Sequence, residues 1–199
     1  MNRAALDVSG LPSFAFGKRS ILWWATIGMI AIEGTVFALM IAGYIYLKWR
    51  EPDWPPAVAP PQLFWGTLTT MVVLISAIPN ELTRRAAMRL DIRQTRIWIT
   101  ASTVMAAAFC VTRAYEFTAL NVWWDTNAYG SVVWTLLGLH TAHVLTDTID
   151  TGFLSVLMFT GPLDANRFVD VAENAMYYYF VIASWLPIYG LIYFAPRLS

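Results

Sequence analysis

The sequence predicts an all-α integral membrane protein with five transmembrane helices. Of its 199 residues, 58% are hydrophobic and only 13% are charged, and the mean hydropathy is +0.53. A soluble domain of this size carries about twice that charged fraction. No long stretch alternates between polar and apolar residues, so we do not expect a β-barrel. Thirteen basic residues balance thirteen acidic ones, which excludes nucleic-acid binding through a positive field.

Five apolar segments are each close to the ~20 residues that a membrane-spanning helix needs. No linker or repeat divides them, so we expect one membrane domain over residues 1–199. The mixed polarity at the start does not fit a cleavable signal peptide. The expected spans are about 21–47, 63–79, 97–120, 128–159 and 168–194.

The connections between these spans differ in character. Glu51–Pro61 contains five prolines, which exclude a helix there. Glu81–Arg96 contains five arginines in a stretch that a helix could accommodate, and the second span could extend toward it. Gly161-Pro162 marks a turn before the last span.

The distribution of Lys and Arg predicts the orientation. With the N-terminus inside, nine of these residues lie on the inner side and four toward the outer side. The inner group includes Arg84 and Arg85, which we expect near anionic lipid headgroups. We therefore expect the N-terminus inside and the C-terminus outside.

Ionisable residues at membrane depth are candidates for function. Glu33 lies about 18 Å into the first span, near the bilayer midplane. A bare carboxylate there is costly, so it is expected to be protonated, paired or facing a polar cavity. It is either a hydrogen-bonded structural acid or a proton or lipid site.

The fourth span carries His140, His143 and Asp147 on one helical face. This polar face must point to protein or water, and we expect it to lie beside Glu33. It is a hydrogen-bonded seam, a proton relay or a metal site. In the third span, Arg113 and Glu116 are spaced to form a structural ion pair.

The number of metal ligands limits redox chemistry. The only two histidines lie on one helix, so they cannot hold one haem from opposite sides, and the single cysteine, Cys110, excludes thiolate clusters. We expect no haem, copper or other cofactor in this chain. A copper site at the histidines and Asp147 is the alternative left open.

Several motifs occur in the order found in one membrane family. They are Glu33 with Phe37, Pro61 before an apolar run, Ala114-Tyr115-Glu116-Phe117, Tyr129-Gly130-Ser131 followed by Gly138-Leu139-His140-Thr141-Ala142-His143-Val144, and Phe168-Val169-Asp170-Val171. On these residues the chain resembles subunit III of haem–copper terminal oxidases, the cytochrome c and quinol oxidases, in a short five-helix form. Some positions depart from the family pattern: Thr141 and Asp147 stand where it usually has glycine, and Glu173 stands in place of a tryptophan.

The resemblance implies an accessory subunit without a catalytic centre. Its expected partners are the catalytic subunit I and subunit II, which carry haem and copper, together with phospholipid held in a cleft between helices. It implies support of proton uptake and a place in the bacterial inner membrane, with Glu33 and the first signature histidine beside the lipid cleft. The alternatives are an accessory subunit of a nitric oxide reductase, a stand-alone metal-dependent membrane enzyme, and a small proton or ion transporter.

Overall fold

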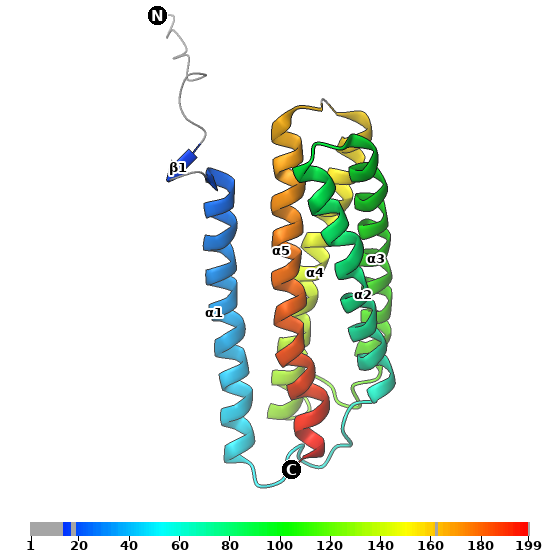
Figure 1. Ribbon diagram of the computed structural model, residues 1–199. Coiled ribbons are helices and arrows are strands. Elements are labelled where there is room, and N and C mark those ends of the chain that lie inside the picture. The colour runs from blue at the N-terminus through cyan, green and yellow to red at the C-terminus, as the bar shows by residue number, and fades with distance from the viewer. Residues whose placement is uncertain (1–13, 17–18, 162, 199) are drawn as a thin grey trace, which may run out of the picture.

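Five long helices run up and down in sequence order, each antiparallel to the next (Figure 1). The computed structural model describes residues 14–16, 19–161 and 163–198. The helices are α1 (Ile21–Arg50), α2 (Leu63–Met88), α3 (Ile92–Thr118), α4 (Ala128–Thr160) and α5 (Ala165–Tyr189). A π-helical turn, Gly190–Phe194, and a 3-10 turn, Ala195–Arg197, follow α5. A short antiparallel hairpin, β1 (Phe14–Phe16) and β2 (Arg19–Ser20), precedes α1 and was not predicted.

Side chains at the N-caps explain where four of the helices begin. The side chains of Ser20, Asp91, Asn127 and Asp164 each accept a hydrogen bond from a backbone N–H in the first turn of α1, α3, α4 and α5. Such caps satisfy donors that have no partner within the helix.

The all-helical prediction is confirmed for the described residues apart from the hairpin. Within that part of the chain, four helical runs are long and apolar enough to cross a membrane: α1, α2, α3 and Ala165–Arg197. The fourth helix, α4, is the longest, with 33 residues, and it is not among these four runs. The helices support a membrane protein, and α4 carries both histidines of the chain.

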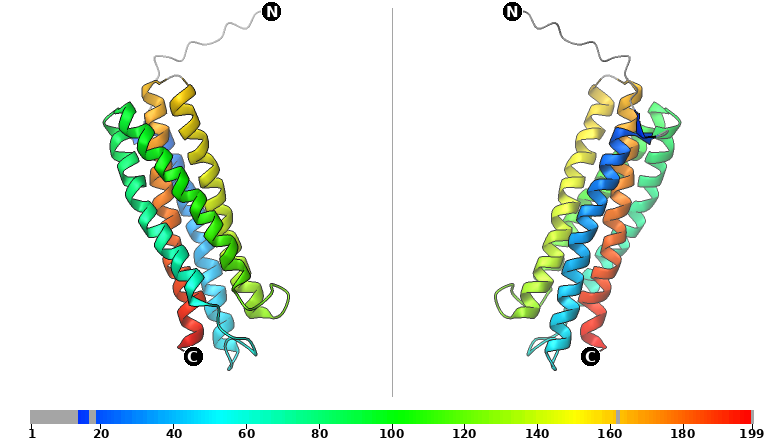
Figure 2. Two further views of the ribbon diagram at one scale, coloured as in Figure 1. Left: turned by 90° about the vertical axis from the view of Figure 1, so that its right-hand side faces the viewer. Right: turned by 90° about the vertical axis from the view of Figure 1, so that its left-hand side faces the viewer.

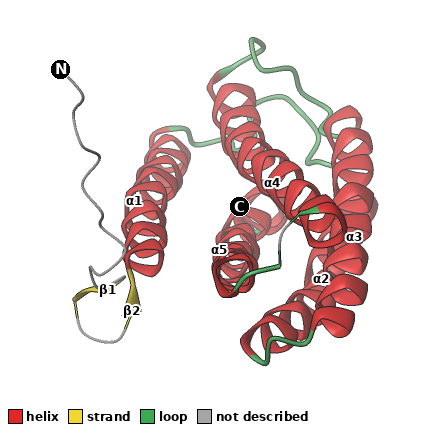
Figure 3. Ribbon diagram, turned by 90° about the horizontal axis from the view of Figure 1, so that it is seen from above, coloured by secondary structure: helices red, strands yellow, loops and turns green. Residues whose placement is uncertain are grey.

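Helices α2, α3, α4 and α5 form a tight group, and α1 lies to one side against α4 and α5 (Figures 2 and 3). The main core lies at their centre and includes Leu136, Leu137 and Trp185, none of which is exposed. Helix α1 buries Thr26, Phe37 and Tyr44, which share one face, while Ile32 and Leu39 on its other face are about 70% and 67% exposed.

The lower end of α1 is fixed by the loop that follows it. Trp54 is buried in this loop, and its Nε1–H donates to the Tyr44 hydroxyl at 3.0 Å. The rings of Tyr44, Trp54 and Tyr129 meet edge to face or tilted. The Lys48 ammonium donates to the carbonyl oxygen of Ala195 at 2.8 Å, which ties α1 to the C-terminal turn. Helix α1 is therefore anchored at the end opposite its N-terminus.

Candidate functional site

The polar face of α4 divides between two neighbouring environments. His140 is fully buried and points into the group formed by α3 and α5. His143, three residues later, is partly exposed and faces α1. Positions three residues apart differ by about 60° around a helix. The two histidines therefore serve different clusters, although they share the same broad face.

The first cluster is a buried charge network around Arg113. Its Nη1–H donates to Glu116 Oε2 at 2.9 Å, and its Nη2–H donates to His140 Nδ1 at 3.2 Å. Tyr193 donates its hydroxyl hydrogen to Glu116 Oε1 at 2.6 Å, and His140 Nε2 lies 3.0 Å from the carbonyl oxygen of Val181. The Arg113 and Glu116 side chains are 1% and 0% exposed. The network joins α3, α4, α5 and the turn after α5.

The partners of His140 determine its hydrogen positions. A guanidinium group only donates, so Nδ1 accepts from Arg113 and carries no hydrogen. A carbonyl oxygen only accepts, so Nε2 carries the hydrogen and donates to Val181. His140 is therefore a neutral imidazole with both nitrogens occupied. Both of its ring nitrogens are therefore engaged by partners within the protein.

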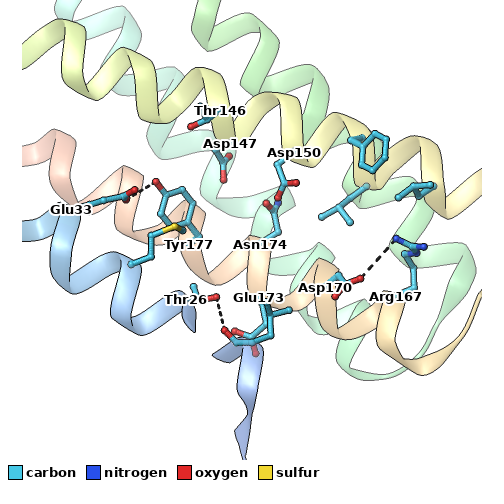
Figure 4. A pocket seen from close by; sticks show the side chains of 15 residues that line it. Thr26, Glu33, Thr146, Asp147, Asp150, Arg167, Asp170, Glu173, Asn174 and Tyr177 are labelled. Carbon is cyan, nitrogen blue, oxygen red and sulfur yellow. Dashed lines mark hydrogen bonds and ion pairs between the residues drawn. The ribbon is translucent and has the colours of Figure 1, made fainter. Parts of the chain in front are cut away.

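The second cluster joins α1, α4 and α5 through Glu33. Tyr177 donates to Glu33 Oε2 at 2.7 Å, and His143 Nε2 lies 3.5 Å from Glu33 Oε1 (Figure 4 shows the Tyr177 bond). The Phe37 ring lies 5.0 Å from the ring of His143 and 6.2 Å from that of His140. Glu33 therefore lies beside the histidine face, as the sequence predicts, and its partner there is His143. His140 is engaged by Arg113 and Val181.

His143 approaches Glu33 through its Nε2 atom. His143 Nδ1 lies 2.6 Å from the carbonyl oxygen of Leu139, so Nδ1 carries a hydrogen. Nε2 then faces Glu33 Oε1 at 3.5 Å, which is longer than a well-formed hydrogen bond. The His143 and Glu33 side chains are 15% and 22% exposed, so the contact is only partly buried.

A groove of about 540 Å³ runs along these residues between α1, α4 and α5 (Figure 4). It is lined by Leu22, Thr26, Met29, Glu33, Thr146, Asp147, Asp150, Phe153, Leu154, Leu157, Arg167, Asp170, Glu173, Asn174 and Tyr177. Asp147 is 3% exposed, and neither of its carboxyl oxygens has a hydrogen-bond partner among the described residues. At one end of the groove, Arg167 Nη1 lies 3.9 Å from Asp170 Oδ2. The groove thus combines carboxylates with apolar walls.

Arg84 and Arg85 lie on the last turns of α2 and share one carboxylate. Arg84 makes two hydrogen bonds to Glu81, at 2.8 and 2.9 Å, and Arg85 makes one at 2.6 Å. Tyr179 also donates to Glu81, at 2.9 Å. Arg84 lines a second hollow of about 650 Å³ between the ends of α1, α2 and α5. Arg85 is 62% exposed at the same end of the bundle.

The described residues do not bring the predicted metal ligands together. No group of three His, Cys, Asp or Glu side chains among them lies close enough to hold one metal ion. His140 and His143 point to different neighbours, as given above, and Asp147 faces the groove. The copper alternative at these three residues has no support in this geometry.

Sequence reasoning missed the tyrosines of both clusters. Tyr177 is 144 residues from Glu33, and Tyr193 is 77 residues from Glu116. Asp150 and Asn174 were also not singled out, although Asp150 lies three residues after Asp147 on the face toward α1 and α5. That spacing was a signal that could have been used.

A family model described as cytochrome c oxidase subunit III matches residues 52–196, well over half of the chain. The chain belongs to this family. The subunit 3 of Thermostichus vulcanus is 25% identical over 174 residues, which cover 83% of each protein. The probable subunit 3 of Mycobacterium tuberculosis is 29% identical over 178 residues, covering 85% of each. That of Alkalihalophilus pseudofirmus is 25% identical over 203 residues, covering 95% of this chain and 96% of the relative.

Membership of the subunit III family confirms the resemblance predicted from the motifs. It makes the protein an accessory subunit of a membrane-bound haem–copper oxidase in a respiratory chain. It also favours this reading over a nitric oxide reductase, a stand-alone enzyme or a transporter. The family model begins after α1, but a match to 95% of the chain includes most of α1 and its Glu33.

Proposed function

We propose that this subunit III stabilises the catalytic subunit of a bacterial haem–copper oxidase, holds phospholipid in the groove beside α1 and supports proton uptake. The family match carries the proposal, and the bacterial relatives support a place in the inner membrane. Subunits I and II are the proposed partners, and they supply the haem and copper. The single domain of residues 1–199 crosses the membrane five times, and α4 is the fourth of these spans along the chain.

Apolar surface supports the partner and lipid roles. Ile32, Leu39 and Trp49 on α1 are about 70%, 67% and 83% exposed, and other long helices also present large apolar side chains outward. In a bilayer such surface contacts lipid tails or other helices. The groove along Glu33 adds carboxylates to these apolar walls, which suits an amphiphilic molecule.

The distribution of positive charge supports the proposed orientation. The start of α1, the α2–α3 turn and the α4–α5 turn lie at one end of the bundle (Figure 1). The basic residues described near this end are Arg19, Arg84, Arg85, Arg89, Arg93, Arg96 and Arg167, against Lys48, Arg50 and Arg197 at the other. Arg3 and Lys18, also expected inside, lie outside the described residues. The arginine-rich end is therefore proposed to face the cytoplasm.

Purification in mild detergent tests the assembly. A tag on this chain is expected to retain subunits I and II, with the visible spectrum of their haem. The same preparation without this subunit is expected to lose activity faster during turnover. Isolation of the chain alone from mild detergent, with no oxidase subunit attached, would contradict the proposal.

A further inference from the structure

The carboxyl group of Asp147 differs from those of Glu33 and Asp170 in the same groove. Glu33 is engaged by Tyr177 and faces His143, and Asp170 faces Arg167. Asp147 is only 3% exposed. Neither of its carboxyl oxygens has a hydrogen-bond partner among the described residues. A buried polar group without a partner costs free energy. Its orientation into an open groove indicates that a ligand supplies the missing donors.

The charge of the groove indicates the sign of that ligand. Its lining residues include five acids, Glu33, Asp147, Asp150, Asp170 and Glu173, and one base, Arg167. Figure 4 shows Asp147 and Asp150 projecting from α4 into the same space, with Asn174 opposite them on α5. Asn174 donates to the Thr151 hydroxyl at 2.7 Å, which fixes its amide and leaves its carbonyl oxygen as a further acceptor. All of these oxygen atoms favour a positively charged hydrogen-bond donor.

We propose that the groove binds a primary ammonium group, which Asp147 and Asp150 receive. An ammonium has three N–H donors and no acceptor, so it complements the free oxygens of Asp147. A quaternary choline group has the same charge but no N–H. The groove has a volume of about 540 Å³, which lies in the range of sites that bind small organic molecules. It is much larger than the volume of one ion.

The walls of the groove indicate what carries the ammonium. Leu22, Met29, Phe153, Leu154 and Leu157 supply apolar surface next to the carboxylates. The acids lie at increasing depth below the headgroup level. Asp170 lies about 8 Å from the start of α5, and Asp150 and Asp147 lie about 15 and 20 Å from the end of α4. An ethanolamine phospholipid offers an ammonium and alkyl chains together, and a soluble amine offers the ammonium alone.

This inference deepens the lipid-holding role proposed above. It rests on that role only where it takes the ammonium group to belong to a phospholipid.

The test compares lipids retained by the complete oxidase complex. The complex is purified, stripped of lipid and exposed to equal amounts of phosphatidylethanolamine, phosphatidylcholine and phosphatidylglycerol, and the bound lipids are counted by native mass spectrometry. The wild type is expected to prefer ethanolamine over choline lipid about tenfold, as a charge-assisted hydrogen bond would give. Asp147→Asn is expected to lose this preference and Asp150→Asn to weaken it. Asp125→Asn, an exposed carboxylate in the α3–α4 loop, is the matched control.

Additional arms distinguish the sources and the alternatives. In one arm, soluble glycerophosphoethanolamine is added and the thermal stability of the complex is measured. If it stabilises the wild type but not Asp147→Asn, the groove takes a soluble amine. Stabilisation by Ca²⁺ or Na⁺ that depends on Asp147, without any effect of amines, would overturn the proposal. So would an unchanged lipid preference in Asp147→Asn. Failure of the chain to retain subunits I and II would instead contradict the proposed function.

Discussion

At the scale of single residues, two histidines one turn apart have separate roles because their partners differ. The sequence was sufficient to predict that Glu33 and His140 lie at similar depth, and that Glu33 lies beside the face of α4 that carries His140, His143 and Asp147. It could not assign the partners, because a rotation of about 60° around α4 decides whether a side chain meets Arg113 or Glu33.

Glu33 is expected to react with a hydrophobic carbodiimide, which modifies protonated carboxyl groups in membranes. Its side chain is 22% exposed and lines the groove, so a reagent that partitions into the membrane can reach it. Glu33→Gln is expected to abolish the labelling, measured by mass spectrometry of peptides, while leaving assembly largely intact. Glu116, 0% exposed, is the internal control and is expected not to react. Persistent labelling of the Glu33→Gln chain would contradict this assignment.

The buried pair of Arg113 and Glu116 is expected to show strong coupling. Arg113→Met leaves the Glu116 carboxylate buried without its counter-charge, which costs about 3–5 kcal/mol of unfolding free energy. Arg113→Met combined with Glu116→Leu is expected to cost much less than either change alone. Unfolding in mixed micelles measures these differences. Arg85→Met, which breaks an exposed pair, is the control and is expected to cost under about 1 kcal/mol.

At the scale of helices, hydrophobicity located the elements but not all their ends. Residues 63–79 were predicted as the second span, with a helix that could extend toward the arginine-rich stretch, and α2 does continue through Pro79 to Met88. Within this extension Thr83 donates its hydroxyl hydrogen to the Pro79 carbonyl oxygen at 2.8 Å. Helix α3 begins at Ile92, after the Asp91 cap, and not at residue 97. Both helices extend into arginine-rich sequence, because a helix ends where its hydrogen bonding ends and hydropathy detects only its apolar part.

Two glycines of α4 provide a matched test of packing at the start of that helix. A Cβ at Gly130 would lie 2.2 Å from the backbone carbonyl oxygen of Trp123, whereas a Cβ at Gly138 meets nothing within 4 Å. Gly130→Ala must therefore displace the α3–α4 loop, and we expect a loss of about 1–3 kcal/mol in unfolding free energy. Gly138→Ala is expected to be neutral or stabilising, since alanine favours a helix. Equal thermal stability of the two variants would show that the loop does not pack as described.

At the scale of the whole molecule, the order of the helices follows from short connections, but the position of α1 does not. Short turns make α2 and α3, and α4 and α5, antiparallel neighbours, which the sequence pattern alone indicates. Helix α1 lies against α4 and α5 and away from the helix that follows it, because Tyr44 and Trp54 pack on Tyr129 of α4. Contacts between such distant residues leave no periodic signal in the sequence. With its C-terminal end held in this way, α1 has its N-terminal half beside the acidic groove.

The orientation of this assembly can be tested with single cysteines on a chain that carries Cys110→Ala. Arg89 lies exposed in the α2–α3 turn and Asp125 lies exposed in the α3–α4 loop, at opposite ends of the bundle (Figure 1). An impermeant thiol reagent added to intact cells is expected to label Asp125→Cys and to label Arg89→Cys only after the membrane is opened. The reason is the excess of arginine at the α2–α3 end, which the positive-inside rule places in the cytoplasm. The reverse labelling would invert the bundle, and the groove at Asp147 would then open toward the lipids of the outer leaflet.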